Sequence, residues 1–302
     1  MIDYFLSYSS VLDHVLVYTL LAMSQAVVLR AGTFSIGSAA YAAIGAYTAA
    51  ILITSQAWPP LIAIACGTLL AGVISALMGY PLSRLRGVFQ ALATLALVQV
   101  VVTIAQNWDS VTNGVLGISG IPKVATTGWL LLAVALCTAL LYTLGRFGLG
   151  RAMDVIRADE TVAVSLGIQV PYHQRLAMTL SGLLAGLAGA LHACNSYAIQ
   201  PEEFGFGMMV HTLASAVLGG ATSIWGPLVG SAVLTTLPEF VRFFADYRGV
   251  VQGALLMLII IYLPHGIADT LAAWRHDRRI QSSAARPPKG ARTAVRSTGV
   301  AQ

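Results

Sequence analysis

The sequence predicts an all-α fold, a polytopic bundle of transmembrane helices with about eight spans (range seven to nine). Hydrophobic residues make up 57% of the 302 residues and charged residues only 10%, and the mean hydropathy is +0.77. A soluble domain carries about 25% charged residues, so this chain has too few charges to cover a surface that faces water. Its apolar stretches also approach the roughly 20 residues that a helix needs to cross the hydrocarbon core.

The spans are read from these apolar stretches in chain order. Five occupy the first half of the chain and three or four follow in the second half, and we expect eight of these nine candidates to be spans. The candidate spans are 11–29, 34–54, 61–80, 88–106 and 128–145, and then 173–195, 207–224, 227–241 and 250–267.

Basic residues predict the direction of the spans, because loops rich in Lys and Arg stay in the cytoplasm. We expect the N-terminus outside and the C-terminus in the cytoplasm. This direction places 14 of the 17 basic residues inside and leaves three outside, Lys123, Arg242 and Arg248. The first 29 residues contain no Lys or Arg, so we expect no cleaved signal peptide.

The chain divides into a transmembrane domain, residues 1–272, and a basic tail, residues 273–302. From Arg275 onward the chain has seven basic residues and one acid, Asp277, among many Ala, Ser, Pro and Gly residues. This composition predicts disorder. The tail could contact anionic headgroups of membrane lipids, although we favour a simpler role as a flank that fixes orientation.

The longest inside connection, about 146–172, contains the most charged stretch before the tail. Its charges alternate with apolar residues, which predicts a short amphipathic helix or pair of helices. Asp154 and Arg157 have the i, i+3 spacing of a surface pair, and Gly167 is placed to end the helix before Pro171. Two interpretations stay open, an interfacial helix on the membrane and a docking surface for a soluble partner. The charged residues are Arg151, Asp154, Arg157, Asp159 and Glu160.

No residues with the chemistry of an active site stand together. The span interiors are nearly free of ionisable groups, and each exception is expected to be an interfacial or paired residue. The chain has no phosphate-binding loop of the G-x-x-x-x-G-K-[ST] type, no metal-ligand set, and three cysteines expected to be core residues. We therefore predict no catalytic residues, no metal and no cofactor, and any ATPase that drives the protein must be another subunit. The ionisable residues near the spans are Asp13, His14, His192, His211 and Glu239.

Gly- and Pro-marked stretches interrupt the hydrophobic pattern. Residues 31–38 and 218–227 share a Gly, Ser-Ile, Gly pattern. Interrupted helices at matching positions can indicate internal duplication and a translocation path. The other interpretation is two ordinary turns between helices, and the residues alone favour it. Gly182 and Gly186 form a GxxxG step, for which close packing within one subunit is favoured over a dimer interface. The interrupting residues assigned to the path are Gly32, Ser35, Gly37, Gly219, Gly220, Gly226 and Pro227.

Two loops are predicted on the outside, 113–122 and 200–206. The second holds two adjacent acids, which could meet basic groups of an external partner or could simply be solvated. The residues of these loops expected to face a partner are Gly117, Ser119, Gly120, Pro122, Glu202 and Glu203.

An ordered set of stretches from about residue 20 to 268 resembles one family, the permease subunits of branched-chain amino acid ABC importers (the Liv family, its M-type subunit). The order and spacing of the stretches carry the resemblance. They are Arg84–Phe89 with Ala93–Ala96, Gly117–Pro122, Gly150–Ala152, Ile156–Glu160, Leu166–Ile168, Ala185–Leu191, Pro201–Glu202, Val217–Gly220, Trp225–Pro227 and Gly249.

The resemblance implies a permease subunit in the bacterial inner membrane, without a nucleic-acid partner. Its partners would be a second permease subunit (an H-type paralogue), two cytoplasmic ATPase subunits and a periplasmic substrate-binding protein. Residues 150–168 would be the coupling segment that seats in the ATPase, and Thr94 of the fourth span would belong to the translocation path. The chain departs from the family at Ser38, often a His, and at Gln99, often an acid. The solute could thus be a branched-chain amino acid or a related small polar solute. The alternative to an ABC importer subunit is a gradient-driven transporter or facilitator of a small solute.

Overall fold

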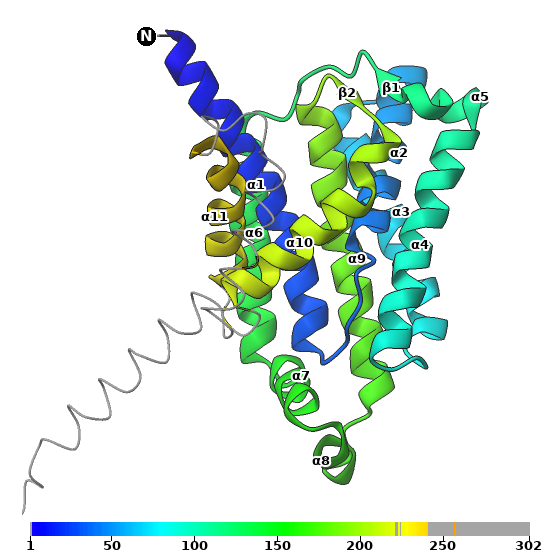
Figure 1. Ribbon diagram of the computed structural model, residues 1–302, viewed down its shortest axis with the longest axis vertical. Helices are drawn as coiled ribbons and strands as arrows, with labels where there is room; N and C mark the ends of the chain where they lie inside the picture. The colour runs from blue at the N-terminus through cyan, green and yellow to red at the C-terminus, as the bar shows by residue number, and fades with distance from the viewer. Residues whose placement is uncertain (1, 221–222, 224, 241–256, 258–302) are drawn as a thin grey trace, which may run out of the picture.

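The computed structural model describes residues 2–240 except 221, 222 and 224, and residue 257. Within these residues the chain is an elongated bundle of helices (Figure 1). The candidate span 250–267, the tail 273–302, and Arg242 and Arg248 lie outside the described residues, apart from residue 257.

Six of the described helices are long and apolar enough to cross a membrane. They confirm the predicted all-α, polytopic fold. The six are α1 (Ile2–Arg30), α2 (Ser38–Gln56), α3 (Pro60–Leu82), α4 (Val88–Asn107), α6 (Thr127–Arg146) and α9 (Val170–Asn195).

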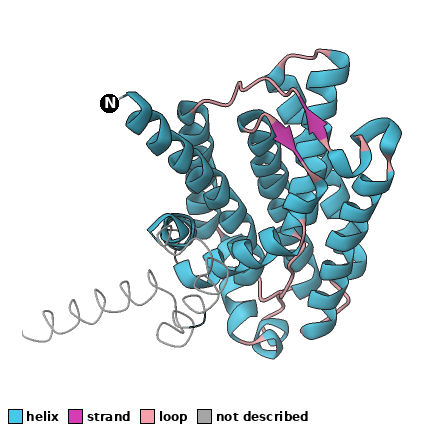
Figure 2. Ribbon diagram, turned by 45° about the horizontal axis from the view of Figure 1, so that its top comes forward, coloured by secondary structure: helices cyan, strands magenta, loops and turns pink. Residues whose placement is uncertain are grey.

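Shorter elements lie at the two ends of the bundle and beside it. The strands β1 and β2 form an antiparallel pair with Ile118 opposite Ile199, at the end opposite to α7 and α8 (Figures 1 and 2). We call these ends the β1–β2 end and the α7–α8 end. The shorter elements are α5 (Asp109–Thr112), η1 (Gly114–Leu116), β1 (Ile118–Ser119), α7 (Gly148–Ala158), α8 (Glu160–Ser165), β2 (Ala198–Ile199), η2 (Pro201–Phe204), α10 (Phe206–Gly219) and α11 (Gly226–Phe240).

Local chemistry explains where the long helices begin and end. Helix α3 starts at Pro60, whose missing N–H costs nothing in the first turn of a helix, and Pro171 occupies the same region of α9. Helix α2 ends where Ala57 adopts the left-handed conformation, and its N–H donates to the carbonyl of Leu52. Since a residue other than glycine seldom adopts this conformation, the turn into Pro59 and Pro60 must hold Ala57 there.

Helix α9 is the centre of the bundle. In its most apolar stretch 72% of the residues are buried, whereas in that of α6 only 17% are buried. Helix α9 packs on α1, α2 and α3. Glycines permit this close packing: a Cβ on Gly189 would collide with the carbonyl of Ala42 in α2, and one on Gly182 with Ser75 in α3. The GxxxG step therefore packs within the subunit, as the sequence favoured. The exposed apolar faces of α3, α4 and α6 suit a lipid environment.

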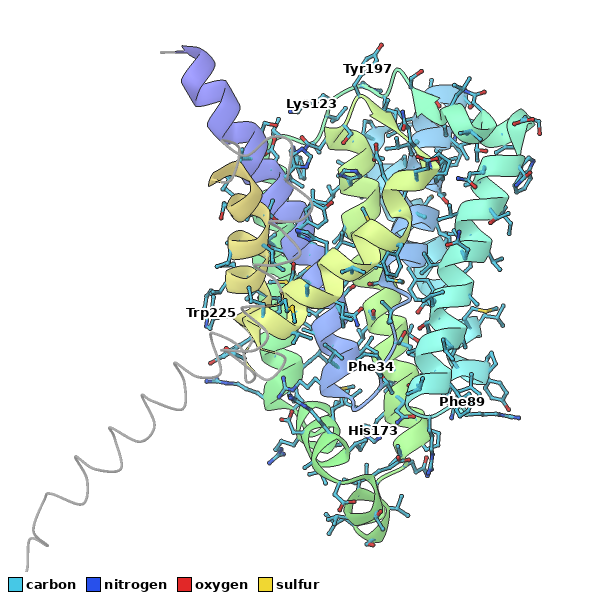
Figure 3. The ribbon with its side chains drawn as sticks, in the orientation of Figure 1. Phe34, Phe89, Lys123, His173, Tyr197 and Trp225 are labelled. Atoms are coloured by element: carbon cyan, nitrogen blue, oxygen red, sulfur yellow. The ribbon has the colours of Figure 1, made fainter. Side chains whose placement is uncertain are left out.

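Helix α10 is too short to cross a membrane singly. Its 14 residues would span about 21 Å, less than the roughly 30 Å of the hydrocarbon core. Helix α11 is described up to Phe240, where the continuous described part of the chain ends. Helix α10 runs obliquely across the bundle and meets α11 near Trp225 (Figures 1 and 3). The candidate span 207–224 thus ends early, at Gly219, and a tight junction follows it.

Candidate functional site

All six residues predicted for the coupling segment lie at the α7–α8 end. Helix α7 leaves α6 after a single extended residue, Phe147, and α8 follows α7 after Asp159. The segment buries a small apolar cluster in which Ile156 and Ala163 pack with Val170 at the start of α9. The two short helices and the first turn of α9 are therefore packed together as one unit.

Asp159 forms the corner between the two helices. Its carboxylate accepts hydrogen bonds from the backbone N–H groups of Thr161 (2.7 Å) and Val162 (3.2 Å), which makes it the N-cap of α8. These backbone hydrogen bonds favour the charged form and hold the pKa of Asp159 below its usual range. A charged residue that looked like a docking contact in the sequence thus has a structural task in this corner.

Gly167 ends α8 as predicted. Its φ is +78°, its N–H donates to the carbonyl of Val164 at 2.9 Å, and the N–H of Ile168 donates to the carbonyl of Ala163 at 3.0 Å. These are the two hydrogen bonds of a Schellman motif. The motif turns the chain sharply into α9.

The predicted pair of Asp154 with Arg157 is wrong. Asp154 instead binds Arg30, the last residue of α1, through two hydrogen bonds of 2.7 Å. A bidentate pair of charged groups is among the stronger hydrogen-bonded contacts in proteins. Sequence spacing could not find it because 124 residues separate the partners.

Two further contacts attach the segment to other parts of the bundle. Glu160 lies 3.0 Å from Arg86, in the turn between α3 and α4. The backbone of Arg157 packs on Gly32, where a Cβ would come within 3.3 Å of the Arg157 Cα. Gly32 also has a φ of +71°, so both its conformation and its neighbour favour glycine. Arg151, by contrast, is exposed.

The predicted path residues of the first half are brought together by a buried polar network. The backbone N–H of Ile36 donates to the Thr94 hydroxyl of α4 at 3.0 Å. The Gln25 side chain of α1 donates to the carbonyl of Ser35 at 2.6 Å and accepts from Ser38 at 3.1 Å. The network fixes the segment 31–37, which includes Gly32, Ser35 and Gly37, between α1 and α4.

The path residues of the second half form a separate packed junction between α10 and α11. A Cβ on Gly219 would collide with the backbone of Gly226, and one on Gly226 with the carbonyl of Gly220. Pro227 lines a mainly apolar pocket that also includes Arg30 and Met153. The matching Gly patterns therefore mark two different tight connections, one between α1 and α2 and one between α10 and α11.

The predicted loop residues gather at the β1–β2 end. Gly117 has a φ of +72° and lies against the carbonyl of Ile199, and Gly120 has a φ of +81°. Pairing of β1 with β2 joins the two loops directly (Figure 2). The loop residues that meet at this end are Gly117, Ser119, Gly120, Pro122, Glu202 and Glu203.

Polar residues near the β1–β2 end also contact one another. The Asp13 carboxylate, which is buried, accepts a hydrogen bond from Thr127 (2.6 Å) and lies 3.7 Å from the Lys123 ammonium. His192 lies 3.3 Å from Glu203. The sequence predicted interfacial or paired residues here, but no local spacing indicated which residues would be the partners.

The sequence matches a family model described as the permease component of the branched-chain amino acid transport system, over residues 7–260. It is 30% identical to the high-affinity branched-chain amino acid transport system permease protein LivM of Escherichia coli (strain K12), over 83% of this chain and 68% of that protein. It is also 30% identical to the autoinducer 2 import system permease protein LsrC of Klebsiella pneumoniae, over 57% of this chain and 52% of LsrC.

A shorter match links the chain to a second type of permease. It is 30% identical to the permease protein LivH of Salmonella typhimurium, over 39% of each chain. No solved structure matches the chain.

Proposed function

The chain belongs to the family of branched-chain amino acid transport system permease components, and on that premise we propose that it is the membrane-spanning permease subunit of an ABC importer. Its solute would be a branched-chain amino acid or a related small polar solute. The relatives are named for branched-chain amino acids and for autoinducer 2. ATP hydrolysis would take place on separate subunits.

The observation that supports this function best is the way α7 and α8 are attached to the bundle. They form a compact amphipathic unit at one end of the molecule, joined to α1 through Arg30 and Asp154 and to the α3–α4 turn through Arg86 and Glu160. A unit that is attached to the bundle at several points can move as a rigid body and transmit that movement to the helices it contacts. This is what a subunit without its own ATPase needs in order to use an external one.

We further propose that the α7–α8 end faces the cytoplasm. Arg30, Arg84, Arg86, Arg146, Arg151, Arg157 and Arg175 all belong to this end of the bundle, in keeping with the excess of basic residues in cytoplasmic loops. The β1–β2 end would then face the periplasm, with the N-terminus on that side.

Termini on opposite sides require an odd number of crossings. The six long helices give six crossings and return the chain to the periplasmic side. The proposed direction therefore requires an odd number of further crossings after α9. Totals of seven and nine crossings both meet this condition and fall within the expected range of seven to nine.

The partners proposed for the assembly are a second permease subunit of the H type, two ATPase subunits at the α7–α8 end, and a periplasmic binding protein at the β1–β2 end. Similarity of the chain to both LivM and LivH supports a pairing of two related permeases. When the ATPase subunits close on ATP, the coupling segment would move with them, and the helices would re-pack to change the open side.

The test is reconstitution of the complete complex in proteoliposomes, with the binding protein loaded with L-leucine. We expect uptake to require ATP and to survive a protonophore. Uptake that persists without the ATPase subunits and stops with the protonophore would replace this proposal with a gradient-driven transporter. The near absence of charged residues within the described spans argues against that alternative.

A further inference from the structure

Three buried polar atoms near the β1–β2 end have no hydrogen-bond partner among the described residues. They are the Tyr47 hydroxyl of α2 and, on α9, the Nδ1 atom of His192 and the Oδ1 atom of Asn195. Tyr47 is 7% exposed and His192 is 8% exposed. Buried polar groups are nearly always hydrogen-bonded, so these atoms indicate a group that the described residues do not supply.

These atoms lie around the η2 turn. The ring of Phe204, which is fully buried, lies 6.1 Å from the ring of Tyr47 and 6.0 Å from that of His192. Glu203 lies beside it, with its carboxylate 3.3 Å from the Nε2 atom of His192 and 42% of its side chain exposed. Asn195 follows His192 by one helical turn, so the two share a face of α9.

The tautomer of His192 that donates to Glu203 makes two of these three atoms acceptors. A neutral imidazole whose Nε2–H donates to Glu203 has a lone pair on Nδ1. The Asn195 Oδ1 atom and the Glu203 carboxylate are acceptors as well. A negative charge with several acceptors suits a cationic group that carries several N–H donors, and aromatic rings such as those of Tyr47 and Phe204 add attraction for a cation.

We propose that Tyr47, His192, Asn195 and Glu203 form a binding site for the protonated amine of the transported solute, which we call the amine site. It lies at the β1–β2 end of α2 and α9, where the solute would enter the permease. The exposed edge of Glu203 opens it to that side. The inference rests on the proposed function and goes beyond it by assigning solute-contacting residues and the solute group that they recognise.

Among the described residues, nearby basic groups do not compete for the amine site. Lys123 lies at the same end (Figure 3) but pairs with Asp13. The ring of His14 lies 6.4 Å from that of His192. The site therefore keeps the negative charge of Glu203 available to a cation.

The first test changes Glu203→Gln in the full complex in proteoliposomes, with Asp109→Asn as the matched control, because Asp109 is an exposed acid of α5 at the same end. If Glu203 holds the solute, L-leucine moved per ATP hydrolysed should fall at least tenfold, while stimulation of ATP hydrolysis by the loaded binding protein stays within twofold of wild type. The control should change neither quantity. Equal loss of uptake and of stimulation in Glu203→Gln would show that Glu203 serves docking of the binding protein, and the amine site would be wrong.

The second test does not depend on transport. In a variant with Cys66, Cys137 and Cys194 changed to Ala, Asn195→Cys is modified with 2-aminoethyl methanethiosulfonate, a cation, and with the anionic 2-sulfonatoethyl reagent. The preference for the cation should fall at least fivefold when Glu203→Gln is added. In addition, 3-methylbutylamine should slow the modification, while 3-methylbutanol, which lacks only the amine, should not.

An unchanged preference, or equal protection by amine and alcohol, would overturn the amine site. The two proposals fail separately: uptake without the ATPase subunits would overturn the proposed function and leave the labelling result intact. Loss of the labelling effects would overturn the amine site and leave ATP-driven uptake intact.

Discussion

At the scale of single residues, the contacts of the proposed coupling segment, residues 150–168, involve partners that lie far away in the sequence. Helical spacing suggested that Asp154 would meet Arg157, but an exposed i, i+3 pair contributes only about 0.2–0.5 kcal/mol. The structure gives Asp154 to Arg30 in a bidentate contact. The role of Gly167 could be predicted, because a glycine in the left-handed conformation that ends a helix is a local feature of the sequence. The partner of Asp154 could not be predicted, because it lies far away in the sequence.

The pair of Arg30 and Asp154 should carry movement of α7 into α1. We expect Asp154→Arg and Arg30→Asp each to lower ATP-driven uptake at least threefold, because like charges then face each other, and the double variant to recover most of it. Uptake and ATPase stimulation in proteoliposomes measure this. Stability should change by no more than about 1 kcal/mol, as is usual for partly exposed pairs. A double variant that is no better than the worse single one would contradict the direct contact.

Asp159 should make the corner between α7 and α8 sensitive to acid. Its folded pKa is lowered by the backbone hydrogen bonds of Thr161 and Val162. The stabilisation of the α7–α8 corner by the charged Asp159 carboxylate is therefore present above the unfolded pKa of about 3.9. It is lost as the pH falls through the lower, folded pKa. We expect hydrogen exchange at Thr161 and Val162, corrected for its intrinsic pH dependence, to rise on acidification. Asp159→Asn, which keeps an acceptor oxygen but does not titrate, should remove that rise.

At the scale of elements, the long helices could be predicted and their ends only in part. The expected spans 88–106 and 128–145 agree closely with α4 (Val88–Asn107) and α6 (Thr127–Arg146), because apolar length alone defines them. The expected span 34–54 began too early. Residues 34–37 are apolar or small, but their backbone is held in a loop by Gln25 and Thr94.

Close packing of α9 on α2 gives a prediction at the same scale. A Cβ on Gly189 would collide with the backbone carbonyl of Ala42, whereas one on Gly207 would meet no atom within 4 Å. Gly189→Ala should therefore destabilise the protein by about 1–3 kcal/mol, the usual cost of overpacking. Gly207→Ala should change it little. Thermal unfolding of the purified chain in detergent compares them, and equal melting temperatures would contradict this packing of α9.

At the scale of the whole molecule, the sequence predicted the class of protein, while the structure was needed to show how distant segments meet. Apolar length and low charge were sufficient for a polytopic helical bundle. Strand β1 pairs with β2, and His192 and Glu203 meet near Tyr47. The residues that meet in these contacts are more than ten, and in some cases more than a hundred, positions apart in the sequence. Local patterns carry no information on such contacts.

The central claim is that the α7–α8 end lies in the cytoplasm, where an external ATPase can reach it. Two leucines allow a matched test, because Leu166 after α8 is 67% exposed and Leu116 near β1 is 85% exposed. Each is changed to Cys in the variant without Cys66, Cys137 and Cys194, and intact cells with a permeabilised outer membrane are treated with a membrane-impermeant maleimide. We expect labelling of Leu116→Cys at once, and of Leu166→Cys only after the inner membrane is opened. Labelling of Leu166→Cys from outside the intact inner membrane would contradict the account.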